Sequence, residues 1–339
     1  MKKFYFFLLI PHLWIQAANT AEIDSVTPRK IELDDSAEAI NSIITQRIQE
    51  GITNANTYRE YIEEIDDYLE IDYECDEDVL YSELRKSIFQ SYTVSWGLRG
   101  YALDLQLRSL LSGQSYSLSL NDSIYRDIDY LEGFSLKLKE LSDVVNIDGH
   151  LVGLDKIGHF FAEGWQYFEL TRYQGESVEA ALEWGRLQEM GKYGYVTTGI
   201  FSYADLTANL NGWRFWNRIL LEEDDPVKSW WANLFERPYI SCEIQVIESI
   251  KKMQLVKAWE QGARFDISAY IDGAWDEANN CNSYADPVIE NKVVSRIKQI
   301  DAGFLCPLNA EYCMSAREKY GRYAKYILHP YCMIAGDED

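Results

Sequence analysis

Apolar side chains recur every three or four positions over long stretches of this chain, which constrains its fold more than any other feature. Between Ser36 and about Glu50, five apolar residues fall on one helical face: Ala39, Ile40, Ile43, Ile44 and Ile48. The same spacing predicts helices over 58–69, 79–112 (one helix or a broken pair), 153–172, 177–192, 203–220, 227–235, 242–260, 266–279, 287–299 and 310–328, with strand content only at 116–120 and 144–147. The expected fold is mainly α, with a multi-helix globular core.

The first 21 residues have the pattern of a secretory signal peptide. Lys2 and Lys3 precede an apolar run over 4–15, and small residues that suit cleavage follow as far as Ala21. No later apolar run reaches the roughly 18 residues that a membrane-spanning helix needs. The mature chain is therefore expected to be exported to the periplasm or the extracellular space, soluble or peripheral to the outer membrane.

The six cysteines agree with an oxidising compartment. All of them follow the apolar segment: Cys75, Cys242, Cys281, Cys306, Cys313 and Cys332. An even count predicts up to three disulfides, although the sequence does not choose among the possible pairings. Because five of the six lie after residue 240, the C-terminal helical part is the one expected to be stapled by disulfides.

The charge balance limits the partners. The 339 residues contain 32 Lys and Arg against 55 Asp and Glu, a formal net charge of −23. Nucleic acid and anionic lipid are disfavoured, because both attract clustered basic side chains. An envelope glycan, a lipid or another protein remains as a partner class. The chain is expected to divide into the signal peptide (1–21), an acidic N-terminal helical segment (22–78), a central helical unit with the candidate site (79–222) and a C-terminal Cys-containing helical region (223–339).

The most informative stretch is 149–163, within the predicted helix 153–172. Asp155, His159 and Glu163 are spaced i, i+4 and i+8, which places them on one helical face. Two carboxylates and an imidazole in a row could form half of a metal site or an acid–base pair. Gly158 and Gly164 are poor helix formers, so we expect another backbone to approach closely there.

A second polar stretch opens the predicted helix 203–220. Ser202 has the position of an N-cap and Asp205 that of the third helical residue, the spacing of a capping box. Asp205 and Asn209 are again i, i+4, and Gly212 extends the same side. Glu189, which precedes the loop to Ser202, is the best-placed further carboxylate.

If these two helices pack face to face, their polar side chains converge and must bond one another, a metal or a substrate. One hypothesis is an envelope hydrolase with His159 as ligand or general base, Asp155 orienting it, Asp205 as ligand or acid, Asn209 binding substrate and Glu189 as a further catalytic carboxylate. The cofactor is left open, and a divalent metal would take its ligands from Asp155, His159, Glu163 and Asp205.

The alternative is a non-enzymatic structural or interaction factor in which the same residues form a polar network between packed helices. His159 would then be a core histidine satisfied by a carboxylate, and Asp205 only a cap. The chain has no GxSxG, HExxH, Walker or Rossmann pattern that would decide for an enzyme. Exposure separates the two hypotheses, since a catalytic cluster should be open to solvent and a structural one sealed.

The two stretches together resemble a known signature. Asp155-Lys156-x-x-His159-Phe160 followed by Ser202-x-x-Asp205-Leu206-x-x-Asn209-x-x-Gly212 is similar to the pattern of VanZ-like proteins and of YfiM-type predicted periplasmic lipoproteins. In these families a glutamate often lies between the two halves, and Glu189 is the matching position. The resemblance covers about 60 residues, from 153 to 212, and implies a shared site and an envelope setting, with no assigned reaction. This chain differs in lacking both a spanning helix and a lipidated cysteine.

Overall fold

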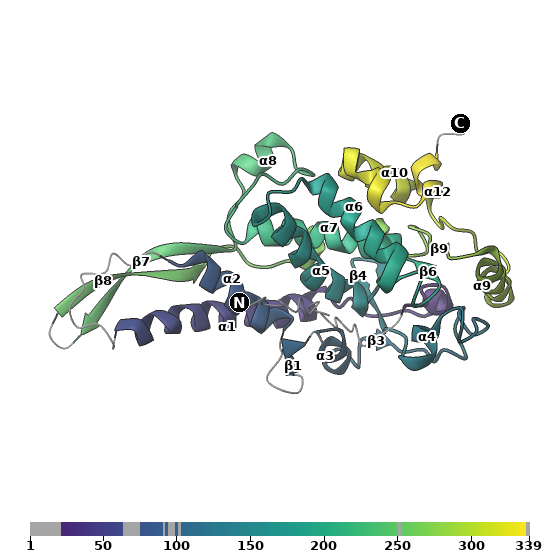
Figure 1. Cartoon of the computed structure of the whole chain (residues 1–339), viewed down its shortest axis with the longest axis horizontal. Helices are drawn as coiled ribbons and strands as arrows, with labels where there is room; N and C mark the ends of the chain where they lie inside the picture. Colours follow the sequence, from purple (N-terminus) through teal and green to yellow (C-terminus); the bar gives the residue numbers. More distant parts are fainter. Residues whose placement is uncertain are drawn as a thin grey trace, which may run out of the picture.

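Two long helices, α5 (Leu154–Arg172) and α7 (Tyr203–Arg218), pack against each other in the middle of the molecule (Figure 1). The structure is a computed structural model that describes residues 22–63, 75–90, 92–93, 99–100, 103–249 and 252–336. The expectation of a mainly α fold with small sheets is confirmed. The helices expected over 153–172 and 203–220 are α5 and α7.

A tight hairpin leads into α5. Strands β4 (Val144–Ile147) and β5 (His150–Gly153) pair in antiparallel fashion through the turn residues Asp148 and Gly149, whose φ angles are 50° and 82°. Two successive positive φ angles are the geometry of the turns that best match the twist of two strands. The strand expected at 144–147 is therefore confirmed, and α5 begins directly after β5 with Gly153 as its N-cap residue.

Helix α7 is buried on every side. Its N-cap is Ser202, whose Oγ accepts a hydrogen bond from the backbone N–H of Asp205 at 3.2 Å, as the capping spacing predicted. Every residue from Ala204 to Asn217 is buried. A helix surrounded in this way lies in the centre of a core. Just before it, β6 (Ile200–Phe201) pairs with β9 (Ser283–Tyr284) and so brings a distant C-terminal segment next to the start of α7.

The α5–α7 crossing depends on two glycines. A Cβ atom on Gly164 would lie 2.5 Å from Cα of Gly212, and a Cβ atom on Gly212 would lie 1.8 Å from the carbonyl oxygen of Phe160. The close backbone approach expected at Gly164 is confirmed. The same expectation for Gly158 is wrong, because the space around it is open within 4 Å.

Helix α1 (Ala37–Glu63) runs along one side of the molecule beside the hairpin of β7 (Ile240–Ser249) and β8 (Lys252–Gln261) (Figure 1). The backbone N–H and C=O of Trp259 bond to the side-chain amide of Asn56, each at 2.9 Å. Ile40, Ile44 and Ile48 of α1 are buried, so the helix predicted from Ser36 is confirmed and extends further than expected. Residues 64–69 of the second predicted helix lie outside the described residues.

The expectation of a helix over 242–260 is wrong. This segment is a β-hairpin that pairs from Ile240↔Gln261 to Ser249↔Lys252. Cys242, Ile244 and Val246 alternate with polar residues, and this period of two, rich in β-branched residues, is that of a strand. The helix expected over 266–279 is also wrong, because Asp266 and Asp272 accept local backbone hydrogen bonds that close short 3-10 turns instead.

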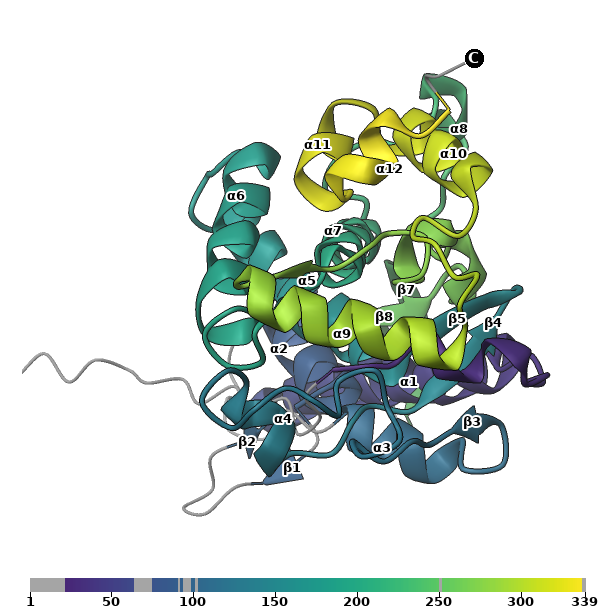
Figure 2. The ribbon, with the colours of Figure 1, turned by 90° about the vertical axis from the view of Figure 1, so that its right-hand side faces the viewer.

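The remaining elements lie around the two central helices and towards the ends of the molecule (Figures 1 and 2). The stretch 79–112 contains two separate helices, so the broken pair, one of the two predicted alternatives, is confirmed. The elements are 3-10 helices at Thr27–Lys30, Ile267–Ala269, Gly273–Trp275 and Gly321–Tyr323, a π-helix at Glu189–Tyr193, α2 (Glu77–Ile88), β1 (Tyr92–Thr93), β2 (Arg99–Gly100), α3 (Leu103–Leu110), β3 (Ser115–Tyr116), α4 (Phe134–Leu138), α6 (Val178–Gln188), α8 (Trp230–Leu234), α9 (Pro287–Ile300), α10 (Ala310–Tyr320), α11 (Ala324–Ile327) and α12 (Pro330–Ile334).

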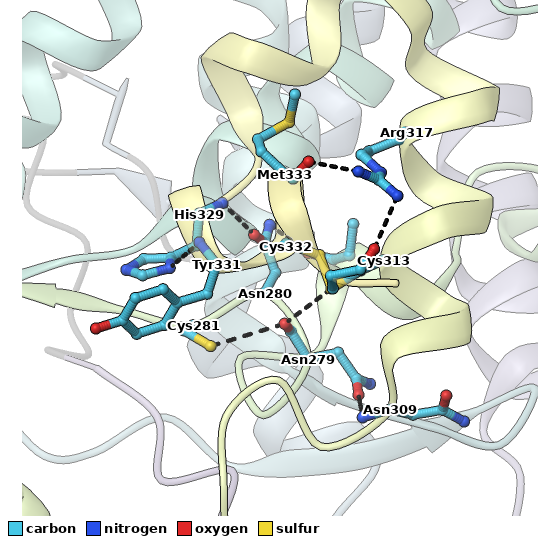
Figure 3. Close-up of a disulfide and its surroundings, with 12 residues drawn as sticks. Asn279, Asn280, Cys281, Asn309, Cys313, Arg317, His329, Tyr331, Cys332 and Met333 are labelled. Carbon is cyan, nitrogen blue, oxygen red and sulfur yellow. Dashed lines mark hydrogen bonds between the residues drawn. A yellow bond between two sulfur atoms is a disulfide. The ribbon is translucent and has the colours of Figure 1, made fainter. Parts of the chain in front are cut away.

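Three disulfides account for all six cysteines: Cys75–Cys242, Cys281–Cys306 and Cys313–Cys332. Two of them lie within the C-terminal region, and the first instead joins the start of α2 to β7, so the expected C-terminal staple is only part of the arrangement. Figure 3 shows the buried Asn280 beside the Cys313–Cys332 disulfide. Its side chain bonds to the backbone N–H of His329 and the backbone C=O of Ile327, both at 2.9 Å, and to the Thr207 hydroxyl of α7 at 3.2 Å.

Within the described residues, no helix has the length and apolar character that a membrane span requires. The predicted signal peptide, residues 1–21, lies outside them. The proposed division at residues 78 and 222 stays a prediction; the main hydrophobic core takes side chains from all three segments, for example Ile44, Phe160 and Trp275.

The two glycine environments predict opposite effects of alanine. Gly212→Ala should destabilise the protein by ~3 kcal/mol, the upper end of the usual range for overpacking, because its methyl group would meet backbone that cannot move aside. Gly158→Ala should instead stabilise it by about 0.5–1 kcal/mol, since alanine is the better helix former and the space is open. Urea unfolding of the two variants measures both; equal effects would contradict the crossing described here.

Candidate functional site

A buried lysine stands at the centre of the polar residues between α5 and α7. The Nζ atom of Lys156 lies 2.9 Å from Oδ2 of Asp155, 2.6 Å from Oδ1 of Asp205 and 2.7 Å from Oε1 of Glu277. Its side chain is fully buried, and the three carboxylates are almost so. An ammonium group has three N–H donors, so each carboxylate can take one of them.

His159 lies next to this lysine on α5. Its Nε2 atom is 3.3 Å from Oδ2 of Asp205, and its Nδ1 atom is 3.2 Å from Oδ1 of Asn209 and 3.8 Å from Oε2 of Glu163. Both ring nitrogens therefore face acceptors. The side chains of His159 and Glu163 each keep 13% of their surface exposed, which makes them the outer edge of the cluster.

Glu189 reaches the cluster from the π-helix Glu189–Tyr193, which interrupts the chain between α6 and α7. Its Oε1 atom accepts a hydrogen bond from the backbone N–H of Ser202 at 3.2 Å. The Ser202 hydroxyl in turn donates to Oε1 of Glu277 at 3.0 Å. Ser202, the N-cap residue of α7, thus donates hydrogen bonds to two carboxylates from other segments, one through its backbone N–H and one through its hydroxyl.

Further contacts to the cluster come from segments outside the two central helices. The Ser142 hydroxyl accepts the backbone N–H of Asp155 at 3.0 Å. The Asn282 amide donates to Oε2 of Glu277 at 2.7 Å. Glu22 is buried nearby and accepts the Thr198 hydroxyl at 2.7 Å. We call Lys156, Asp155, Asp205, Glu277, His159, Asn209 and Glu189 the Lys156 cluster.

Burial and neighbouring charges keep both His159 and Glu189 protonated at neutral pH. Burial lowers the pKa of His159, but the negative charges of Asp205 and Glu163, and that of Glu189 once it ionises, outweigh it and raise the pKa to about 9. Burial raises the pKa of Glu189 to about 8, with a further contribution from the Asp205 charge. At neutral pH the imidazole is therefore charged and the Glu189 carboxyl mostly neutral.

The other groups of the cluster follow the same balance. Burial disfavours the charged form of Lys156, but the surrounding carboxylates hold its pKa well above the ordinary value. Burial acts against ionisation of Asp205 too, yet His159 and Lys156 bring its pKa below the ordinary value. Burial also raises the pKa of Asp155, Glu277 and Glu22, whose repulsion from neighbouring carboxylates adds to the effect.

The structure brings together the predicted site residues. Asp155, His159, Asp205, Asn209 and Glu189 all lie in the cluster, and Glu163 lies at its edge. Their catalytic and metal-binding roles stay predictions.

The sequence interpretation missed the two members that complete the centre. Lys156 appeared only as part of the motif, although a lysine four positions before Phe160, on the apolar side of a predicted helix, is itself a signal for buried carboxylate partners. Glu277 had no such signal, because the β6–β9 pairing brings its segment to α7 from 72 positions further along the chain, counted from Asp205.

Over the described ranges, no group of three or more His, Cys, Asp and Glu side chains has the arrangement of a metal site. Two of the four oxygen and nitrogen ligands proposed for a metal, Asp155 and Asp205, instead contact the ammonium group of Lys156.

In comparisons with known proteins, no family model, curated protein or solved structure matches this chain. The resemblance to VanZ-like and YfiM-type proteins accordingly stays a prediction.

The raised pKa of His159 predicts that stability falls as the solution becomes alkaline. The contribution of the charged imidazole is fully present below pH 6.5 and is lost as the pH rises through about 9, a loss of about 3 kcal/mol. Glu189 contributes a fall of the same sign that ends near pH 8. The slope of unfolding free energy between pH 8 and 9 should therefore flatten in His159→Gln.

His329→Gln is the matched control for this measurement. Burial lowers the pKa of His329 to about 4, so this imidazole is neutral in the folded protein throughout the alkaline range. Its replacement should shift the stability curve without changing its slope above pH 8. An unchanged slope in His159→Gln would contradict the charged state assigned to His159.

Proposed function

We propose that this chain is an exported, non-enzymatic cell-envelope protein, and that the Lys156 cluster is the polar network that holds its central helices together. The observation that carries the proposal is the enclosure of the Lys156 ammonium group, whose Nζ atom lies within 2.9 Å of carboxylate oxygens of Asp155, Asp205 and Glu277. An ammonium group that is kept protonated by three carboxylates has no free electron pair with which to act on a substrate.

His159 supports the same interpretation. A general base needs a neutral imidazole with one nitrogen open to the substrate. Here Asp205 and Asn209 lie 3.3 Å and 3.2 Å from the two ring nitrogens, and a pKa of about 9 keeps the ring charged at neutral pH. The imidazolium is thus bonded as a structural cation, in the way that Lys156 is.

The burial of the Lys156 cluster also supports its structural role. The side chains of Lys156, Asp155, Asp205 and Glu277 expose between 0% and 7% of their surface. We expect a structural cluster to be sealed from solvent and a catalytic cluster to be open to it, so this burial favours the structural role. Buried ions of this kind are stable only when they are paired, so the network makes the packing of its segments specific.

The envelope setting has three supports of its own. The three disulfides fit an oxidising compartment. The first 21 residues have the pattern of a signal peptide. The resemblance of 153–212 to VanZ-like and YfiM-type proteins points to the same location. The expected partner of such a protein is another envelope component.

Removing the central cation tests the proposal. Lys156→Met should destabilise the protein by about 3–5 kcal/mol, because three buried carboxylates lose their partner. Lys156→Met combined with Glu277→Gln should recover at least ~1 kcal/mol, since one of the unpaired charges is then removed. Chemical denaturation of the purified variants gives both values.

Lys292→Met provides the control for loss of a lysine ion pair. Lys292 pairs with Glu132 and Asp129 near the surface, where such pairs contribute about 0–1 kcal/mol. If Lys156→Met were no more destabilising than Lys292→Met, or if the second substitution gave no recovery, the structural role would be wrong.

A second candidate is the envelope hydrolase, favoured by the edge of the cluster. His159 and Glu163 keep contact with solvent, and Glu189 lies in a π-helix, a form that is frequent at functional sites. His159→Ala separates the two candidates. The structural role predicts a loss of about 1–3 kcal/mol from unpaired partners, seen as a lower melting temperature.

The hydrolase predicts a different result. His159→Ala and Glu163→Gln would abolish hydrolysis of ester, amide or phosphodiester test substrates and leave the melting temperature nearly unchanged. Metal content of the protein purified from an oxidising compartment, measured with and without His159→Ala, tests the metal-assisted version. Stoichiometric metal that disappears in the variant would favour it.

A further inference from the structure

Four large apolar side chains on and beside α8 point away from the protein. Trp230, Trp231, Leu234 and Phe235 expose 63%, 63%, 56% and 75% of their surface, and no residue of α8 is buried. We call these four residues the α8 patch. Such a concentration of exposed aromatic surface marks an interaction site in a folded protein.

The loop that carries the patch is fixed to the protein below it. Asn233, on the opposite side of the patch residues, exchanges two 3.0 Å hydrogen bonds with the backbone of Asp225. Asp225 forms an ion pair with Arg214 of α7 at 2.7 Å, and Glu236 forms one with Arg218 of α7 at 2.6 Å. The patch is therefore presented by a braced loop, and its exposure is a property of the fold.

We propose that the α8 patch is a docking surface for the zwitterionic surface of a lipid bilayer. Tryptophan and phenylalanine are the side chains that favour the membrane–water interface. The segment from Trp230 to Phe235 contains no charged residue, and the whole chain carries a formal net charge of −23, so an anionic surface is not the preferred partner.

Two other occupants fit the patch less well. A glycan needs polar groups beside the aromatic rings, but the amide of Asn233, the polar side chain within the segment, is engaged with Asp225. A second copy of the chain needs about 800 Å² per partner for a stable interface. The exposed parts of four such side chains amount to on the order of 500 Å². A bilayer has no such minimum area.

A second apolar element lies at the same end of the molecule. Tyr331 and Ile334 of α12 are 56% and 62% exposed. Both α8 and α12 lie at the upper end in Figures 1 and 2, which share their vertical axis. A membrane that meets α8 can therefore approach the molecule from the side on which α12 is exposed.

Vesicle flotation tests the proposal with the mature full chain and phosphatidylcholine vesicles. The wild-type protein should float with the vesicles, to the same extent at high salt, and its tryptophan emission should move to shorter wavelength. Trp230→Ser combined with Trp231→Ser should weaken the binding roughly ten-fold or more, as expected when two large side chains no longer enter the interface. Its melting temperature should be unchanged, because both side chains are exposed.

The matched control replaces two exposed apolar neighbours at another place on the surface. Tyr130 and Leu131, 54% and 95% exposed, lie a few residues before α4 in the chain, and α4 itself is at the lower end of the molecule in Figure 1. Tyr130→Ser with Leu131→Ser should bind vesicles like the wild type. Wild-type protein that stays unbound, equal loss in both double variants, or stronger binding to anionic vesicles would overturn the proposal.

Two further outcomes would assign the patch to another occupant. Sedimentation that shows a wild-type dimer dissociated by the tryptophan substitutions would make the patch an interface between copies. Retention on an insoluble glycan, lost in the same variant, would make it a glycan site. The inference does not rest on the function proposed for the Lys156 cluster, because failure of either leaves the evidence for the other in place.

Discussion

The ammonium group of Lys156 is removed from water, and its burial is tolerable only because three carboxylates surround it. Taking a charge of this kind into the interior costs several kcal/mol, which geometry and hydrogen bonding must offset. The three partners come from α5, from α7 and from the segment before β9, with Nζ–O distances of 2.6–2.9 Å. All three segments must be in place before the charge is paired, so this interaction couples the central and C-terminal parts of the fold.

The approach of the two central helices makes this pairing possible. Aspartate, histidine and asparagine are short side chains and can meet only across closely spaced backbones. Gly164 and Gly212 allow that spacing, since a Cβ atom on either would meet the opposite backbone. The apolar side of the same helices is closed by packed rings such as Phe160 and Phe215, whose centroids lie 5.5 Å apart. The polar network and the aromatic core are therefore two faces of one helix pair.

Local sequence patterns predicted the parts of this site that depend on a single element. The i, i+4 spacing placed Asp155 and His159 on one face of α5, and the capping spacing located the start of α7 at Ser202. Glu277 depends on a pairing between β6 and β9 that spans more than 80 residues, so no local pattern indicates it. The β7–β8 hairpin was mistaken for a helix because its mixture of apolar and charged residues fits both periods over a short window.

Helix α7 connects the buried cluster to the exposed patch. Asp205 contacts Lys156 near its first turn, and Arg218 braces the α8 loop through Glu236 at its last residue. Arg218 lies thirteen positions after Asp205, about 20 Å along the helix axis. If a bilayer meets the α8 patch, that contact lies at the end of α7 opposite to the one that binds Lys156. Substitutions in the α8 patch should then leave the contacts of Asp205 with Lys156 and His159 in place, so the two proposals can be tested independently.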